Sequence, residues 1–197
     1  MDKITKFSGT ALPLERSDVD TDQIIPSDWL KRVERTGFGA GLFEQWRTDS
    51  NFVLNNPNYK SASILIAGPN FGTGSSREHA VWALTDYGFK AVVSSKFGDI
   101  FFNNSTKAGL VPIVVAPELV SKLQLAVKKN PDLEISIDIE ELTLSCESLG
   151  VTSKFPLDEF TRYRFLNGLD DIGITLTHEN DITVFEQSRK SWLPQLV

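Results

Sequence analysis

The chain has 197 residues and a net charge of −6, with 41% hydrophobic and 23% charged residues, which is typical of a soluble globular protein. This length predicts one domain, residues 1–197, and the acidic balance argues against a nucleic-acid partner. No apolar run approaches the length of a membrane span, and the first eight residues lack the apolar core of a signal peptide. The single cysteine, Cys146, excludes an intramolecular disulfide, indicates a cytoplasmic protein, and cannot hold an iron–sulfur cluster by itself.

The N-terminal segment combines a predicted strand, residues 3–14, with an acidic run, residues 17–22. Three aspartates within five residues of this run suggest a calcium loop. The EF-hand pattern fails, however, because the run lacks the glycine and the glutamate that this loop requires. A set of Asx turns with a helix cap is the simpler interpretation.

Residues 26–46 are rich in glycine, aromatic and basic residues. Lys31, Arg32 and Arg35 fall within five positions, and glycines alternate with other residues directly after them. This composition is typical of a mobile loop that orders over a ligand. A solvated basic surface loop is the other interpretation, since charged side chains are mostly exposed.

Strands and helices alternate between residues 62 and 129, which argues for a parallel sheet with helices packed against it. The strands are apolar runs with β-branched residues, and the helices have apolar residues at helical spacing. In order, these elements are strand 62–67, helix 80–87, strand 90–95, helix 97–108, strand 110–115 and helix 117–129. Pro112 indicates an edge strand or an early position within its strand.

Additional strands and a helix are predicted after residue 130, and no internal repeat or linker separates them from the rest. Residues 172–184 give mixed signals. The other predicted elements are strands 133–139, 142–146 and 151–155, helix 157–166 and a docked tail at 191–194.

The most informative stretch is the turn between the first strand and the first helix of the alternating region, Gly-Pro-Asn-Phe-Gly-Thr-Gly-Ser-Ser-Arg-Glu-His at residues 68–79. It is neither a P-loop nor a dinucleotide-binding fingerprint. A helix start offers free backbone N–H groups and a partial positive charge, Gly72 and Gly74 permit a sharp bend, and Arg77 is suited to gripping a carboxylate. The turn therefore predicts a site for a small hydroxy acid or a phosphate.

A purely structural interpretation of this turn competes with the anion site. Ser75 and Glu78 have the spacing of a capping box, so that Ser75 would cap the helix and Arg77 would be solvated. His79, one turn further on, is interpreted as a structural residue, with acid–base catalysis as the alternative.

The motif Asn-Phe-Gly-x-Gly-Ser-Ser-Arg-Glu-His-Ala at residues 70–80 closely resembles the swivel domain of the aconitase superfamily. Nearly the whole chain resembles the small subunits of bacterial 3-isopropylmalate dehydratases. The further matching stretches are Val19–Pro26, Arg35–Gly39, Leu42–Arg47, Trp82–Phe89 and Asn167–Gly173. The resemblance implies an α/β fold, a swivelling β/β/α domain whose mostly parallel central sheet has flanking helices and additional strands.

The resemblance also implies an activity and a partner. The chain would be one subunit of a heterodimeric hydro-lyase that isomerises 2-isopropylmalate and 3-isopropylmalate in leucine biosynthesis, by dehydration and rehydration. A [4Fe–4S] cluster on the large subunit would serve as Lewis acid for the leaving hydroxyl. Small subunits of homoaconitase-like or citraconate-type hydratases are alternatives, as is a non-catalytic anion-binding module.

The site residues implied by the resemblance fall on three segments. In the motif, Ser75 is the expected base, because a helix start and Arg77 stabilise its alkoxide. Ser76 is the expected hydrogen-bond donor to the substrate, and Arg77 the carboxylate clamp. Asp22 is expected near the reacting atoms, with Thr21 lining the site. The loop that contacts the variable part of the substrate supplies Leu30, Lys31, Arg32 and Arg35.

Overall fold

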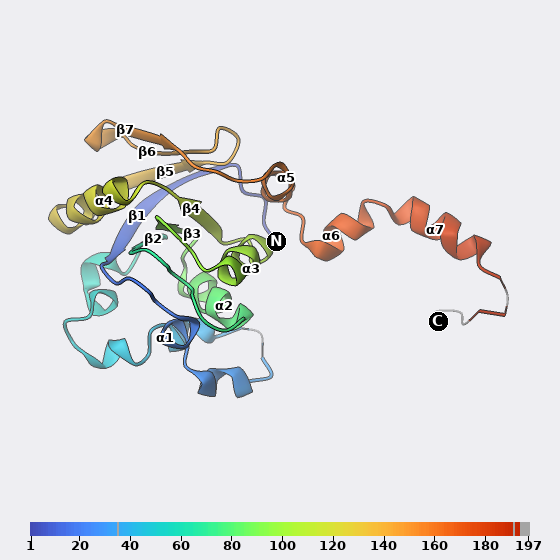
Figure 1. The fold of residues 1–197 in the computed structure, drawn as a ribbon, viewed down its shortest axis with the longest axis horizontal. Helices are drawn as coiled ribbons and strands as arrows, with labels where there is room; N and C mark the ends of the chain where they lie inside the picture. Colours follow the sequence, from blue (N-terminus) through green and yellow to red (C-terminus); the bar gives the residue numbers. More distant parts are fainter. Residues whose placement is uncertain (35, 191, 194–197) are drawn as a thin grey trace.

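The structure, a computed structural model, describes residues 1–34, 36–190 and 192–193, and its centre is a seven-stranded sheet with the order β4-β3-β2-β1-β5-β6-β7 (Figure 1). The strands are β1 (Lys6–Leu14), β2 (Ile64–Ala67), β3 (Ala91–Ser94), β4 (Val111–Val114), β5 (Glu134–Asp138), β6 (Thr143–Cys146) and β7 (Val151–Lys154). The helices are α1 (Thr21–Ile24), α2 (Glu78–Tyr87), α3 (Asp99–Ala108), α4 (Pro117–Lys129), α5 (Glu159–Asn167), α6 (Asp171–Leu176) and α7 (Glu179–Ser188). The predicted α/β fold with flanking helices and additional strands is confirmed, and the sheet is mixed, with three parallel and three antiparallel strand pairs.

β1 joins two different halves of the sheet because it changes partner along its length. Residues 6–10 pair antiparallel with β5, and residues 11–14 pair parallel with β2. The residues of the second half are fully buried, as in most parallel sheets. Those of the first half are exposed or only partly buried. β1 therefore carries the boundary between a parallel half and an antiparallel half.

The parallel half contains the predicted alternation of strands and helices. α2 connects β2 to β3, α3 connects β3 to β4, and glycines in the left-handed conformation end both helices, Gly88 with a φ of 120° and Gly109 with a φ of 84°. The edge position predicted from Pro112 is confirmed, since β4 is the outermost strand. α4 packs across β1, β2 and β3, where the amide of Gln124 donates to the carbonyls of Leu14 and Ile66, both at 3.1 Å.

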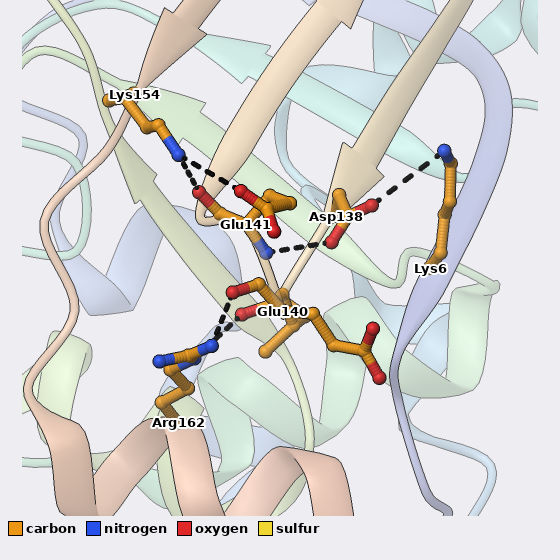
Figure 2. Close-up of polar contacts among 7 residues, drawn as sticks. Lys6, Asp138, Glu140, Glu141, Lys154 and Arg162 are labelled. Carbon is orange, nitrogen blue, oxygen red and sulfur yellow. Dashed lines mark hydrogen bonds and ion pairs between the residues drawn. The ribbon is translucent and has the colours of Figure 1, made fainter.

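The antiparallel half consists of β5, β6 and β7, the predicted additional strands, and it is tied to α5 through the turn after β5 (Figure 2). The carboxylate of Asp138 accepts from the backbone N–H of Glu141 at 2.9 Å. Arg162 of α5 donates to the carbonyl of Glu140, and Lys154 of β7 donates to the carbonyl of Glu141. The bond from Arg162 thus holds α5 against the turn, and the other two stabilise the turn itself.

α6 and α7 project away from the rest of the molecule (Figure 1). The region with mixed sequence signals is thus helical. The predicted docked tail is wrong where the structure describes it, because the side chain of Trp192 is 74% exposed and buries too little surface to hold the chain. Residues 191 and 194 of that tail lie outside the described residues. No helix in the described part of the chain is long and apolar enough to cross a membrane.

Candidate active site

The glycine-rich motif lies where the carboxyl ends of β1, β2 and β3 meet, the edge at which open α/β sheets commonly bind ligands. Its backbone is held from both sides. The N–H of Gly72 donates to the carbonyl of Val19, after β1, at 2.8 Å. On the other side, the N–H of Phe71 donates to the carbonyl of Lys96, after β3, at 3.1 Å, and the N–H of Gly98 donates to the carbonyl of Phe71 at 2.9 Å. Backbone hydrogen bonds therefore hold the motif between the loop that follows β1 and the loop that follows β3.

The predicted need for glycine in this loop is confirmed by its geometry. Gly72 has a φ of 76° and Gly74 a φ of 91°, conformations that L side chains rarely adopt. A Cβ atom added to Gly72 would lie 2.2 Å from the ring of Phe101. Phe101 is itself buried, stacked on Phe97 and edge-on to Phe71, so displacing its ring would disturb the core. The backbone at Gly72 thus lies directly against the ring of Phe101, and this contact sets the position of the residues that follow in the motif.

We expect Gly72→Ala to lower the free energy of unfolding by about 2–5 kcal/mol, since it combines an unfavourable φ with an overpacked contact. Gly150→Ala is the matched control, because Gly150 has a φ of 59° and nothing within 4 Å of its added Cβ. The control should cost only about 1–2 kcal/mol. Urea denaturation measures both values. Equal losses in the two variants would show that the contact with Phe101 is unimportant.

Ser75 does not cap α2, so the capping interpretation of the Ser-x-x-Glu spacing is wrong. The residue at the cap is Arg77, which has a φ of −139° and makes no capping hydrogen bond with its side chain. Ser75 and Ser76 are both exposed, and their hydroxyls have no hydrogen-bond partner within the part of the chain that the structure describes. Two serine hydroxyls are therefore open to a ligand directly before the N-terminus of a ten-residue helix.

A capping box is present instead at α1, where the aspartate-rich run precedes the helix. The carboxylate of Asp20 accepts from the N–H of Gln23 at 2.7 Å, and the N–H of Asp20 donates to the side chain of Gln23 at 3.0 Å. The interpretation of this run as turns with a helix cap is thus confirmed. The cap fixes Thr21 and Asp22, the next two residues of the chain.

Asp22, Thr21 and the motif come together although 54 or more residues separate them in sequence. The carboxylate of Asp22 forms an ion pair with the guanidinium of Arg77, whose side chain is only 15% exposed. Thr21 is buried, and its hydroxyl donates to the backbone carbonyl of Ser75 at 3.0 Å. The competing interpretation, in which Arg77 is solvated, is therefore wrong, because Asp22 orients this side chain beside the two exposed serines.

Lys31 and Arg32, from the predicted recognition loop, make their described contacts within their own segment. Lys31 lies 2.7 Å from the carboxylate of Asp28, a hydrogen bond that raises the pKa of Lys31 and lowers the pKa of Asp28. The guanidinium of Arg32 lies over the ring of Trp29, 3.8 Å from its centroid. Leu30 is half-buried, and Arg35 lies outside the described residues. Within the described part of the chain, Leu30, Lys31 and Arg32 thus make no hydrogen bond or ion pair with the motif.

The second part of this loop is anchored to α2, which sequence analysis did not predict. Phe38 is fully buried, and its backbone N–H donates to the carboxylate of Asp86 at 2.9 Å. The ring of Phe38 lies edge-on to His79, with 5.2 Å between centroids, and His79 also packs against Trp82 at 4.6 Å. The structural interpretation of His79 agrees with this packing. No local pattern indicates the contact between Phe38 and Asp86, since 48 residues separate them.

The described residues offer no group of three or more His, Cys, Asp or Glu side chains close enough together to hold a metal ion. Cys146 is a free cysteine buried in the hydrophobic core, where it packs as a small apolar side chain. The candidate site therefore consists of two exposed hydroxyls, one oriented guanidinium, one carboxylate and the start of a helix.

Comparison with known proteins gives consistent matches over the whole chain. Residues 1–118 match the family described as aconitase C-terminal domain, and residues 171–196 match the family described as the C-terminal domain of the 3-isopropylmalate dehydratase small subunit. A 3-isopropylmalate dehydratase small subunit from Frankia alni is 58% identical over 197 residues, which is all of both chains. One from Streptomyces coelicolor is 56% identical over all of this chain and 99% of the relative. One from Rubrobacter xylanophilus is 53% identical over all of both chains.

A solved structure shows the same fold. The crystal structure of 3-isopropylmalate dehydratase from Methanocaldococcus jannaschii matches with a TM-score of 0.67 and covers 91% of this chain and 99% of that chain. The sequence identity of this pair is 24%, so the likeness concerns the arrangement of the sheet and helices.

Proposed function

The chain belongs to the family of 3-isopropylmalate dehydratase small subunits within the aconitase superfamily, and from this premise we propose that it forms, with a large subunit, the enzyme that interconverts 2-isopropylmalate and 3-isopropylmalate in leucine biosynthesis. The reaction is that of a hydro-lyase: water is removed to give an alkene and is added back at the neighbouring carbon. The observation that carries the proposal is the pair of exposed serines before α2, beside an arginine that Asp22 orients.

Ser75 is the proposed base that removes the proton from the carbon beside a substrate carboxylate. A serine hydroxyl does this only where its alkoxide is stabilised. The N-terminal end of α2 and the guanidinium of Arg77 supply that stabilisation. The hydrogen bond from Thr21 to the backbone carbonyl of Ser75 keeps the serine in place without using its hydroxyl.

Arg77 and Ser76 are the proposed substrate-binding groups of the motif. The planar guanidinium is suited to gripping a carboxylate through two parallel hydrogen bonds. Asp22 already holds one side of this guanidinium, which fixes its orientation before the substrate binds. The hydroxyl of Ser76 is free to donate to a substrate oxygen. Asp22 thus acts beside the reacting atoms.

The leaving hydroxyl requires a Lewis acid, which is the chemistry that a [4Fe–4S] cluster supplies when bound. We assign this cluster to the large subunit. A cluster of this type needs several thiolates, whereas this chain has one cysteine in all, and Cys146 is buried in the core. The residues of the small subunit bind the carboxylate and move the proton.

The segment around Trp29 is the proposed contact for the side chain of the substrate. Leu30 is half-buried and supplies an apolar surface for an isopropyl group. The indole N–H of Trp29 donates to the carboxylate of Glu44 at 2.7 Å, which fixes the ring beside Leu30 in the chain. Lys31, Arg32 and Arg35 add positive charge at the same segment, which attracts an anionic substrate.

The experiment that tests the function uses the purified chain alone and mixed with its cluster-bearing large subunit. We expect no isomerase activity from the isolated chain and full activity from the mixture, because the chain supplies the base and the clamp but not the Lewis acid. Substantial turnover by the isolated chain in the presence of a chelator would contradict this division of roles.

The choice of substrate is tested with malates that carry different side chains. We expect the mixture to prefer the isopropyl compound. A preference for a larger or smaller substituent would identify a homoaconitase-like or citraconate-type enzyme instead. Binding of dicarboxylates without turnover in the complete mixture would identify an anion-binding module.

A further inference from the structure

We propose that the C-terminal arm, defined here as residues 170–190 with helices α6 and α7, is a docking surface for the large subunit. The inference rests on the proposed function, since that function supplies the partner. It is carried by the exposure, the length, the attachment and the charge of the arm.

Exposed apolar side chains are concentrated in the arm. The described part of the chain has ten large hydrophobic residues with exposed side chains, and four of them lie in these 21 residues. They are Ile172 at 71%, Leu176 at 58%, Val184 at 66% and Phe185 at 66% exposure. Phe160 and Tyr163 on the preceding helix α5 are also exposed, at 56% and 50%. Concentrated exposure of this kind marks a surface that binds another protein.

The arm cannot derive stability from its own length. α7 has ten residues and α6 has six, and neither helix has a buried residue. Isolated helices shorter than about 12–15 residues are marginal in water, and helices in proteins are stabilised mainly by packing an apolar face. α7 therefore requires a surface against which Val184 and Phe185 can be buried.

The attachment of the arm directs it away from the body of the molecule. Asp170 caps α6 by accepting from the N–H of Gly173 at 2.7 Å. The carboxylate of Asp171 lies 3.0 Å from Arg164 of α5 and 3.9 Å from Lys107 of α3. These contacts fix the root of the arm, while α7 projects outward (Figure 1). The arm is thus presented to a second protein rather than folded over its own sheet.

The charge of the arm favours a different protein over a second copy of this chain. Residues 170–190 contain five acidic and two basic side chains, a net charge of −3 in which Asp171 is already paired within this chain, and the whole chain carries −6. Two such arms packed together would bring like charges into one interface, which weakens association. The expected partner surface is an apolar groove edged by lysine and arginine, and the large subunit is the protein that must bind this chain for catalysis.

The test compares two single substitutions that each place a glutamate on an exposed apolar position of a helix. Phe185→Glu changes the arm, and Leu125→Glu changes α4, where the side chain is 57% exposed. We expect Phe185→Glu to raise the Kd for the large subunit about tenfold or more, and Leu125→Glu to leave it within about twofold of the parent value. With saturating large subunit, kcat of the Phe185→Glu variant should equal that of the parent, because the motif is unchanged.

A shortened chain that ends at Thr177 gives a second measurement, since it lacks α7 but keeps the ion pairs of Asp171. Unchanged Kd values for both this chain and Phe185→Glu would overturn the proposal. So would a dimeric free chain that Phe185→Glu converts to a monomer in sedimentation, because the arm would then bind a second copy. If the parent chain itself failed to bind or activate the large subunit, the proposed function would be wrong. If the parent is active and its arm variants bind equally well, only the docking role of the arm is contradicted.

Discussion

Ser75→Ala is expected to reduce kcat of the reconstituted enzyme by about 10²- to 10⁴-fold, the usual contribution of general base catalysis. Its effect on stability should be small. Ser75 is exposed and does not cap α2, and the backbone carbonyl that accepts from Thr21 remains in the variant. We therefore expect the free energy of unfolding to stay within about 0.5 kcal/mol of the parent value.

Steady-state kinetics and urea denaturation of the same preparation measure these two effects separately. Ser76→Ala is the matched control, because it removes an exposed hydroxyl from the adjacent residue. The control should raise KM more than it lowers kcat, as expected for a group that binds substrate in the ground state as well as in the transition state. A Ser75→Ala enzyme with nearly full turnover would show that Ser75 is not the base.

Arg77→Lys is expected to lower kcat/KM about 10- to 150-fold, the range set by the loss of one hydrogen bond to a charged group. Lysine keeps the positive charge but not the planar fork that bonds Asp22 on one side and a substrate carboxylate on the other. Because the side chain of Arg77 is 15% exposed, solvent does little to replace the missing bond.

Arg162→Lys provides the control for Arg77→Lys. Arg162 also donates to backbone acceptors, the carbonyls of Ile139 and Glu140, but it belongs to α5 and contacts the turn after β5 (Figure 2). The Arg162→Lys variant should have an altered melting temperature, because these hydrogen bonds change, and an unchanged kcat/KM. Similar kinetic constants in the Arg77→Lys enzyme and the parent would show that charge alone suffices at position 77.

The elements of the parallel half could be predicted because their signals are local. Apolar runs, helical spacing and terminal glycines located β2, α2, β3, α3, β4 and α4 to within a few residues. The helix over 117–129 was predicted with the bounds that the structure has, since Pro117 and the two final lysines mark its ends. The pairing of β5 with β1 was not predictable in this way, because periodicity identifies a strand and not its partner.

The candidate site was predictable in its residues but not in its geometry. The spacing of Ser75 and Glu78 satisfies a local capping rule, yet a tertiary hydrogen bond from Thr21 holds Ser75 and the helix begins after Arg77. The ion pair of Arg77 with Asp22 is likewise a contact between distant segments. The local rule fails at the motif because contacts with the loop after β1 hold its backbone, whereas that loop keeps the helix cap that its own sequence predicts.

The change of partner along β1 has a consequence for synthesis on the ribosome. Residues 11–14 are able to pair once β2 has emerged, but residues 6–10 have no partner until β5 follows, and β5 ends at residue 138. The roughly 70 intervening residues take roughly 4–14 s to translate at bacterial and eukaryotic elongation rates. For that time the nascent chain presents one row of unpaired N–H and C=O groups, the type of edge through which unfinished proteins aggregate.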